Sequence, residues 1–230
     1  MKHAMGLKQA VLSAAVAASI LPALASAQIS GNLSIASQYL WRGQSLFHGA
    51  TLSGGLDYNH QSGLYAGVWT SSENDKNEYD LYAGWGGETD GGFGYDISYI
   101  DYNYFGDDDS CGGAPADACD FAEVHLGASY SGIGADAYLG VGDYGHGSDQ
   151  SDNKDNYYSL NYRYDKITGL VGYYDFDDSK LAYTHIDLSY ALTDQFALTL
   201  SKIVDQDKDA NGDDPWDDDL QVVVSYTLAL

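Results

Sequence analysis

Carboxylate side chains recur at every second position in several stretches of this sequence, with apolar and aromatic side chains between them. In the stretch 78–85, Glu78 and Asp80 alternate with Tyr79, Leu81 and Trp85. If such stretches are β-strands, the carboxylates of each stretch share one face. A ring of carboxylates around a watery passage attracts cations and repels anions, so these residues indicate ion selection.

The polar faces of these stretches are expected to carry mostly negative charge, because only Arg163, with His125 and His185, opposes the acids there. Two interpretations stay open. The acids favour cations collectively, with Asp80 and Asp96 as candidate individual selectors, or they only form a polar lining and pair with Arg163 and tyrosine hydroxyl groups. The predicted pore-lining residues are Asp57, Glu78, Asp80, Asp96, Glu123, Asp136, Arg163, His185 and Asp187.

The loop DQDKDANGDDPWDDD, residues 205–219, resembles a calcium-binding loop. Its acidic and amide side chains follow a D-x-D-x-N-G spacing, with an acid at the twelfth position, which suits a hard cation. It departs from the usual motif because Asp replaces the twelfth Glu and strands replace the flanking helices. A solvated acidic loop is the alternative, and no other cofactor is expected. The candidate Ca²⁺ ligands are Asp207, Asp209, Asn211, Asp213 and Asp218.

Catalysis is not expected. His185, Asp187 and Ser189 alternate along one stretch. Side chains two positions apart on a strand are about 7 Å apart, whereas a nucleophile and its base must be in hydrogen-bond contact. The protein is therefore interpreted as a non-enzyme.

The first 27 residues have the form of a secretory signal peptide. A basic start containing Lys2 and Lys8 precedes an apolar stretch and the small residues Ala25-Ser26-Ala27. The sequence predicts removal of residues 1–27 and a single domain over 28–230. Removal leaves 8 basic and 34 acidic residues, and such a charge excludes nucleic acid as a partner.

Cys111 and Cys119 close a short loop rich in Gly, Ala and Pro. In an exported chain such a pair is most simply a disulfide. A metal site would need two further ligands, and Asp117 and Asp120 are poor companions for thiolates.

From Gln28 onward the apolar period is two, and no stretch has the roughly 20 apolar residues of a membrane helix. The orientations of the third and ninth segments stay open because both of their faces are apolar. A β-bulge is expected at Ile100, where the phase changes. The predicted strands cover residues 29–41, 51–59, 63–71, 78–85, 93–99, 123–130, 133–141, 158–164, 167–174, 184–190, 196–201 and 220–230.

The connections alternate between short turns and loops that are mostly longer and acidic. A soluble β-sandwich, the alternative fold, has no reason to sort its loops in this way. A membrane-spanning antiparallel up-and-down β-barrel does, with its short turns in the periplasm. The sequence therefore predicts an all-β barrel of about 12 strands in the outer membrane of a Gram-negative bacterium. Its expected partners are outer-membrane lipids, the barrel-assembly machinery and small solutes or cations. Inward Tyr82, Tyr138 and Tyr157 are expected to narrow the passage.

The segment YLWRGQSLFHGA, residues 39–50, is expected to finish the first strand. Tyr39 and Trp41 are predicted in the aromatic girdle at the membrane surface. Arg42 has two interpretations: it contacts loop carboxylates or lipid phosphates, or it folds into the mouth of the pore.

Four blocks, SQYLWRGQS, GGLDYNHQSGLYAGVWTS, EYDLYAGWGGE and GYDISYIDYNYFG, resemble those of the TorF porin family of proteobacteria. The resemblance covers Gly31 to Gly106. It implies an outer-membrane barrel with a pore and says little about the solute. Two functions follow as hypotheses: passive, cation-preferring passage of small solutes, or a non-conducting barrel whose acidic outer loops bind divalent cations or a surface partner.

Overall fold

The computed structural model describes residues 28–74, 76–107, 111, 115–141, 154–177 and 179–230. The predicted signal peptide, residues 1–27, lies outside the described residues. Among those that are described, no helix combines the length and apolar character needed to cross a membrane.

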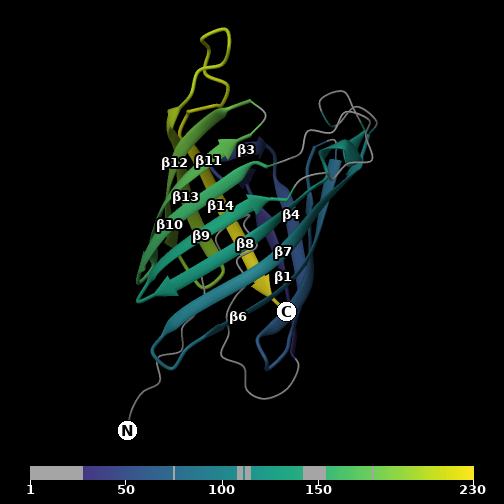
Figure 1. Ribbon diagram of the computed structural model, residues 1–230, viewed down its shortest axis with the longest axis vertical. Coiled ribbons are helices and arrows are strands. Elements are labelled where there is room, and N and C mark those ends of the chain that lie inside the picture. The colour runs from purple at the N-terminus through teal and green to yellow at the C-terminus, as the bar shows by residue number, and fades with distance from the viewer. Residues whose placement is uncertain (1–27, 75, 108–110, 112–114, 142–153, 178) are drawn as a thin grey trace.

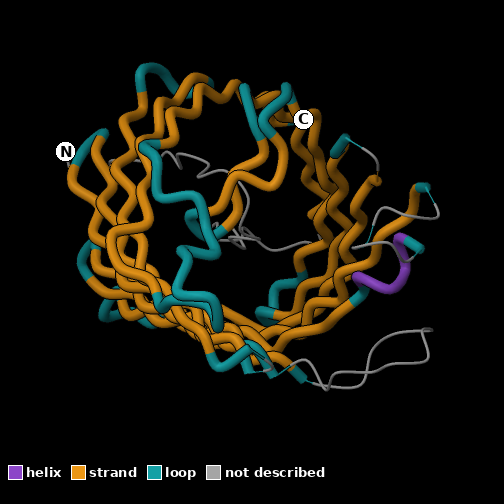
Figure 2. Tube along the Cα trace, turned by 90° about the horizontal axis from the view of Figure 1, so that it is seen from above, coloured by secondary structure: helices purple, strands orange, loops and turns teal. Residues whose placement is uncertain are grey.

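Twelve antiparallel strands form a closed barrel, as the sequence predicts (Figures 1 and 2). Each strand pairs with the next along the barrel wall, and the first pairs with the last, so the sheet has no free edge. The strands of the wall are β1 (Gln28–Ala36), β4 (Thr51–Asn59), β5 (Leu64–Ser72), β6 (Lys76–Glu88), β7 (Phe93–Gly106), β8 (Phe121–Tyr130), β9 (Ile133–Gly140), β10 (Asn156–Tyr164), β11 (Ile167–Phe176), β12 (Leu181–Ala191), β13 (Phe196–Gln206) and β14 (Gln221–Ala229).

The outer face of the barrel is apolar. Leu56, Leu160 and Val222 are each at least half exposed in the isolated chain. Such exposure is expected of apolar side chains that contact lipid in the membrane. In hydrocarbon every backbone group must be paired within the protein, and a closed sheet satisfies this requirement. The barrel therefore spans a membrane, and its architecture is that of bacterial outer-membrane proteins.

Aromatic side chains gather on the outer face at the end with the short turns. The large exposed rings there belong to Trp85, Phe93, Tyr130, Tyr164 and Tyr190. Tyrosine and tryptophan favour the level of the lipid headgroups, where one side of the ring is apolar and the other is wet. This girdle places the short turns at one membrane surface. The longer loops lie at the opposite end, where the loop after β13 projects at the top of Figure 1.

The predicted disulfide is confirmed. Cys111 and Cys119 are bonded, with 5.7 Å between their Cα atoms. The bond closes the loop between β7 and β8, beside a short 3₁₀-helix, η1 (Ala116–Cys119).

The predicted β-bulge at Ile100 is wrong. Strand β7 pairs without interruption with both neighbours, and Ile100, Tyr102 and Tyr104 all point inward and are buried. The sequence indicates a change of phase at Ile100 only if every inward residue is polar. In this part of the barrel the inward residues of β7 are apolar or aromatic. A register shift occurs elsewhere, between Thr184 and His185 of β12.

The two segments of open orientation have defined faces in the barrel. In β5, Tyr65, Trp69 and Ser71 lie on the inner face, and in β11 Thr168 and Tyr174 do so.

The prediction that the first strand continues to Trp41 is also wrong. β1 ends at Ala36, and residues of the next segment form a separate hairpin, β2 (Tyr39–Trp41) and β3 (Gln44–Phe47). Tyr39 and Trp41 are not girdle residues, because this hairpin folds into the barrel and leaves only 4% of Tyr39 exposed. The alternating pattern is the same in a wall strand and in a hairpin, so it does not mark the point where the chain leaves the wall.

Candidate functional site

The tip of the inward hairpin is a two-residue turn, Arg42-Gly43, between the paired residues Trp41 and Gln44. Both turn residues have positive φ, +48° and +87°, as a tight hairpin turn of type I′ requires. A Cβ atom on Gly43 would lie 2.5 Å from the ring of His185, so only glycine fits there. Arg42, in contrast, holds a conformation that is uncommon for a residue with a side chain. The turn thus presents the Arg42 side chain to the barrel wall at some conformational cost.

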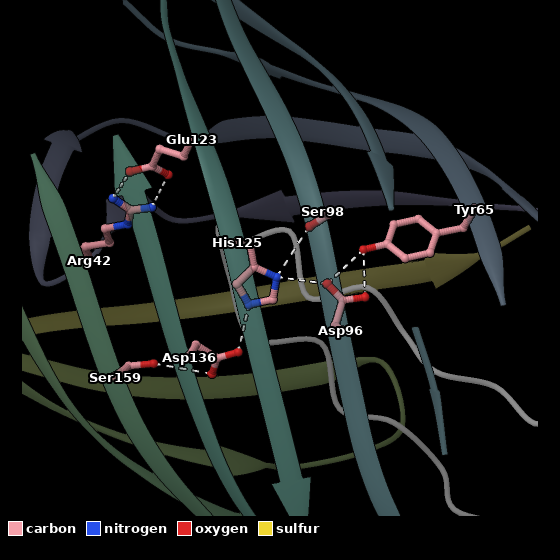
Figure 3. Close-up of polar contacts among 8 residues, drawn as sticks. All are labelled: Arg42, Tyr65, Asp96, Ser98, Glu123, His125, Asp136 and Ser159. Carbon is pink, nitrogen blue, oxygen red and sulfur yellow. Dashed lines mark hydrogen bonds and ion pairs between the residues drawn. The ribbon is translucent and has the colours of Figure 1, made fainter. Parts of the chain in front are cut away.

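Arg42 forms a buried, bidentate ion pair with Glu123 of β8 (Figure 3). Nη1 and Nη2 donate to the two carboxylate oxygens over 2.8 and 2.5 Å, and the two residues are 7% and 1% exposed. The Tyr102 hydroxyl donates to the same carboxylate over 3.0 Å. Paired, two-point contact of this kind is the strong form of an Arg–carboxylate interaction.

Four aromatic rings surround the guanidinium group of Arg42. Its central carbon lies 4.4 Å from the ring centroid of Trp41, 4.7 Å from Tyr138, 4.6 Å from Tyr157 and 5.2 Å from Tyr174. All four distances are within the range of cation–π attraction. Tyr138, Tyr157 and Tyr174 come from β9, β10 and β11 and are direct cross-strand neighbours. The structure thus places a cation in an aromatic cage that ends in a carboxylate.

A second contact anchors the base of the hairpin. The Tyr39 hydroxyl donates to Glu78 over 2.5 Å, and Tyr104 donates to the other oxygen of Glu78 over 3.0 Å. Asp80, two positions further along β6, is 1% exposed, and its Oδ1 atom has no hydrogen-bond partner. The hairpin therefore bridges from β6 across the interior to the cage.

A second polar cluster centres on His125, closer to the short turns (Figure 3). Nδ1 lies 3.0 Å from Asp96 and Nε2 lies 2.9 Å from Asp136. A ring that donates to a carboxylate from both nitrogens is an imidazolium. The Tyr65 hydroxyl contacts both oxygens of Asp96, at 2.9 and 2.8 Å. His125 therefore balances one of the two acid charges beside it.

The remaining predicted residues are spread over the inner wall. Asp57 accepts a hydrogen bond from Tyr82, and His185 lies 3.0 Å from Asp187 through Nδ1. Arg163 is at the end of β10, where its backbone N–H donates to Gly132 of a short turn. All seven predicted carboxylates thus occupy inward positions, but the cation that neutralises Glu123 is Arg42.

A cavity of about 670 Å³ lies at the mouth of the barrel, between the hairpin and the loop that joins β5 and β6. Phe47 and His48 line one side, and Glu73 and Lys76 line the other. Burial raises the pKa of Glu73 to about 7, and the charge of Lys76, 3.9 Å away, only partly offsets this. The second oxygen of Glu73 is buried without a partner.

The acidic loop is closed by its own hydrogen bonds. Asp209 accepts from the backbone N–H groups of Asn211 and Asp213, over 2.8 and 2.9 Å. Asp207 accepts from the N–H of Ala182. Among the described residues, the one group of three close carboxylates is Asp217–Asp219, which includes only Asp218 of the predicted calcium ligands. The calcium site stays a prediction.

Sequence reasoning missed the cage because its parts are far apart in the chain. The available signal was the inward alignment of Tyr138, Tyr157 and Tyr174, once strand pairing brings them together. Of the two interpretations of Arg42, the inward one holds, since the side chain is buried in the barrel. The local pattern did not indicate that it would pack against these three rings.

The fold and the lumen define the class of protein: a twelve-stranded outer-membrane β-barrel with a hairpin folded into its interior. The chain belongs to the family described as "Bacterial protein of unknown function (Gcw_chp)", whose model matches residues 22–219. No curated protein matches the sequence.

The solved structures that resemble the fold include two of one porin. The KdgM porin is 8% identical, with a TM-score of 0.51, and the match covers 87% of this chain and 97% of that one. The KdgM porin in complex with disordered oligogalacturonate is also 8% identical, with a TM-score of 0.50 and the same coverage. At such low identity the likeness establishes the barrel architecture alone.

Proposed function

We propose that the protein is a porin that passes small solutes across the outer membrane passively and prefers cations. The observation that carries this proposal is the set of seven carboxylates on the inner wall of a closed barrel, opposed near them by Arg42 and His125. An acidic lumen attracts cations and repels anions. The resemblance to the TorF porin family and the fold shared with the KdgM porin support a pore.

The acidic wall also separates this protein from its structural neighbour. Oligogalacturonate, with which the KdgM porin is in complex in one of the two solved structures, is a polyanion. Inward carboxylates such as Asp57, Asp96 and Asp187 would repel it. The expected solutes are therefore small cations and small neutral molecules. Outer-membrane lipids and the barrel-assembly machinery are the partners that such a barrel requires.

We infer no catalytic activity. Ser189 donates to or accepts from Thr199, 2.9 Å away. The two nitrogens of His185 face Asp187 and the hydroxyl of Tyr157. A histidine with both nitrogens engaged in this way has no serine to activate.

One observation favours the second candidate function, a non-conducting barrel. The hairpin fills part of the lumen and is held there by Glu78 and Glu123. If it never moves, function would shift to the outer loops, where Asp217, Asp218 and Asp219 gather.

The test is single-channel recording of the refolded protein in a planar bilayer under a salt gradient. We expect a stable conductance with a reversal potential on the cation side. The variant Asp57→Asn/Asp187→Asn should move that potential toward zero. Its matched control, Asp217→Asn/Asp219→Asn, removes the same charge from the outer loop and should move it less. Absence of current from a folded barrel, or anion-sided reversal, would contradict the porin proposal.

A further inference from the structure

The guanidinium group of Arg42 is held in the way a protein holds a ligand. It reaches the wall from a hairpin that is not part of the wall, and Glu123, Tyr138, Tyr157 and Tyr174 receive it from four consecutive strands, β8 to β11. The carboxylate provides two-point hydrogen bonding in a plane, and the rings provide attraction to a flat cation. The receiving residues suit the guanidinium group in both shape and charge.

The receiving side of this contact is built independently of the hairpin. Tyr157 is paired across the sheet with Tyr138 on one side and with Tyr174 on the other, so the strand register alone aligns the three rings. Tyr102 holds Glu123 from β7, and His185 lies 2.9 Å from the Tyr157 hydroxyl. If the hairpin left, these wall contacts would remain.

The hairpin, by comparison, has few means of holding its own shape. It consists of two short strands, and a two-stranded hairpin alone is marginally stable. Arg42 sits at φ +48°, which costs free energy in a residue with a side chain. Its docked position therefore depends on lumen contacts, chiefly those of Tyr39, Arg42 and Gln44 with Glu78, Glu123 and Tyr183.

We propose that Glu123, Tyr138, Tyr157 and Tyr174 form a binding site for solutes that carry a guanidinium group, and that Arg42 is an internal competitor occupying this site while the hairpin is docked. The proposal rests on the proposed function in one respect, since it names a solute class for the pore. Binding itself can be measured without current. A tethered Arg42 competes at a high effective concentration, so free solute binds the wild type weakly.

The variant Arg42→Gly tests the site directly. Glycine accepts the positive φ of the turn, while the guanidinium is removed and Glu123 is left in the cage without its partner. Methylguanidinium is titrated into the detergent-folded variant by calorimetry, with tetramethylammonium and sodium as comparison cations. We expect saturable binding of methylguanidinium, about tenfold or more tighter than to the wild type, because the competitor is gone. The two comparison cations cannot make the two-point contact and should bind more weakly.

A matched variant guards against loss of the fold. Arg42→Gly/Glu123→Gln lacks both charges and so leaves no buried carboxylate unpaired. It should fold and should lose the selective binding. If Arg42→Gly folds only when methylguanidinium is present, that rescue itself supports the site. Equal binding to both variants, or equal binding of sodium and methylguanidinium, would overturn the proposal.

The outcomes separate this inference from the porin proposal. Selective binding without current in any variant would keep the guanidinium site and remove the pore. Cation-selective current without selective binding would keep the pore and remove the site.

Discussion

The interior of the barrel differs between its two ends. The loop half, nearer the long loops, holds the hairpin and large side chains, namely Glu78, Asp80, Tyr102, Glu123, Tyr138, Tyr157, Tyr174 and Tyr183. The turn half, nearer the short turns, also contains Tyr65, His125 and Arg163. Otherwise it is lined mostly by small polar side chains, namely Ser30, Asn32, Asp57, Asp96, Ser129, Asp136, Asn161, Thr168, Ser189 and Thr199. One half resembles the core of a globular protein, and the other resembles the wall of an aqueous channel.

This difference separates two properties of the proposed pore. In the loop half the carboxylates are already engaged, Glu123 by Arg42 and Glu78 by two tyrosines, so this half mainly obstructs the passage. In the turn half Asp96 and Asp136 share one His125, which leaves net negative charge in the passage. The obstacle and the charge preference are therefore expected to respond to different substitutions.

Removal of the hairpin should have the largest effect on conductance, because the loop half would then be open like the turn half. Ala36 and Thr51 are paired across β1 and β4, so a two-residue Asn-Gly turn can replace residues 37–50. We expect a severalfold rise in single-channel conductance with cation preference retained. Shortening the loop at residues 208–214 is the control and should leave conductance unchanged. An unaltered conductance after removal of the hairpin would show that the obstacle lies elsewhere.

Breaking the ion pair between Arg42 of the hairpin and Glu123 of the wall should have the next largest effect. Arg42→Met leaves Glu123 buried and unpaired, and loss of one partner of a buried ion pair costs about 3–5 kcal/mol. Unfolding by urea in lipid vesicles measures this cost. Adding Glu123→Gln should recover most of it, because no unpaired charge then remains. If the double variant lost as much unfolding free energy as the two single substitutions added together, the ion pair would not be what holds the hairpin to the wall.

The disulfide lies in an outer loop, so its removal tests whether a part of the protein outside the lumen affects the pore. Cys111→Ser/Cys119→Ser opens a bond with a sequence separation of 8, and loss of so short a closed loop should lower the unfolding free energy by about 2–3 kcal/mol. Conductance should not change, since neither cysteine is in the hairpin or among the predicted pore-lining residues. A changed conductance would mean that this loop also restricts the pore.

The smallest effect is expected for Glu73, at the mouth of the barrel, and concerns the pH dependence of stability. Burial raises the pKa of Glu73 to about 7, while Lys76 lowers it and Glu78 raises it further. The folded state then holds a proton that the unfolded state releases between about pH 4.5 and 7, so this residue makes the fold more stable as pH falls through that window. Glu73→Gln should remove this contribution. The control is Glu88→Gln, at the end of β6 beside a short turn at the opposite end of the barrel. Identical pH dependence of unfolding in the wild type and Glu73→Gln would contradict the assignment.

Much of the architecture is readable in the sequence because its causes are local. A period of two places Leu160 and Tyr162 on the lipid side and Asn161 on the inner side whatever else the chain does. Alternating loop lengths follow from the up-and-down topology, and the cysteine pair is separated by one short loop. These features need no knowledge of distant residues.

What the sequence by itself determined is thus the barrel, its two faces and the acidity of its inner wall. Only the tertiary structure decided where residues 37–50 go and which cation neutralises Glu123. Arg42 and Glu123 are 81 positions apart, and the three rings of the cage are aligned by strand register. A buried ion pair of this kind forms when several distant groups desolvate together, and no local pattern encodes that event.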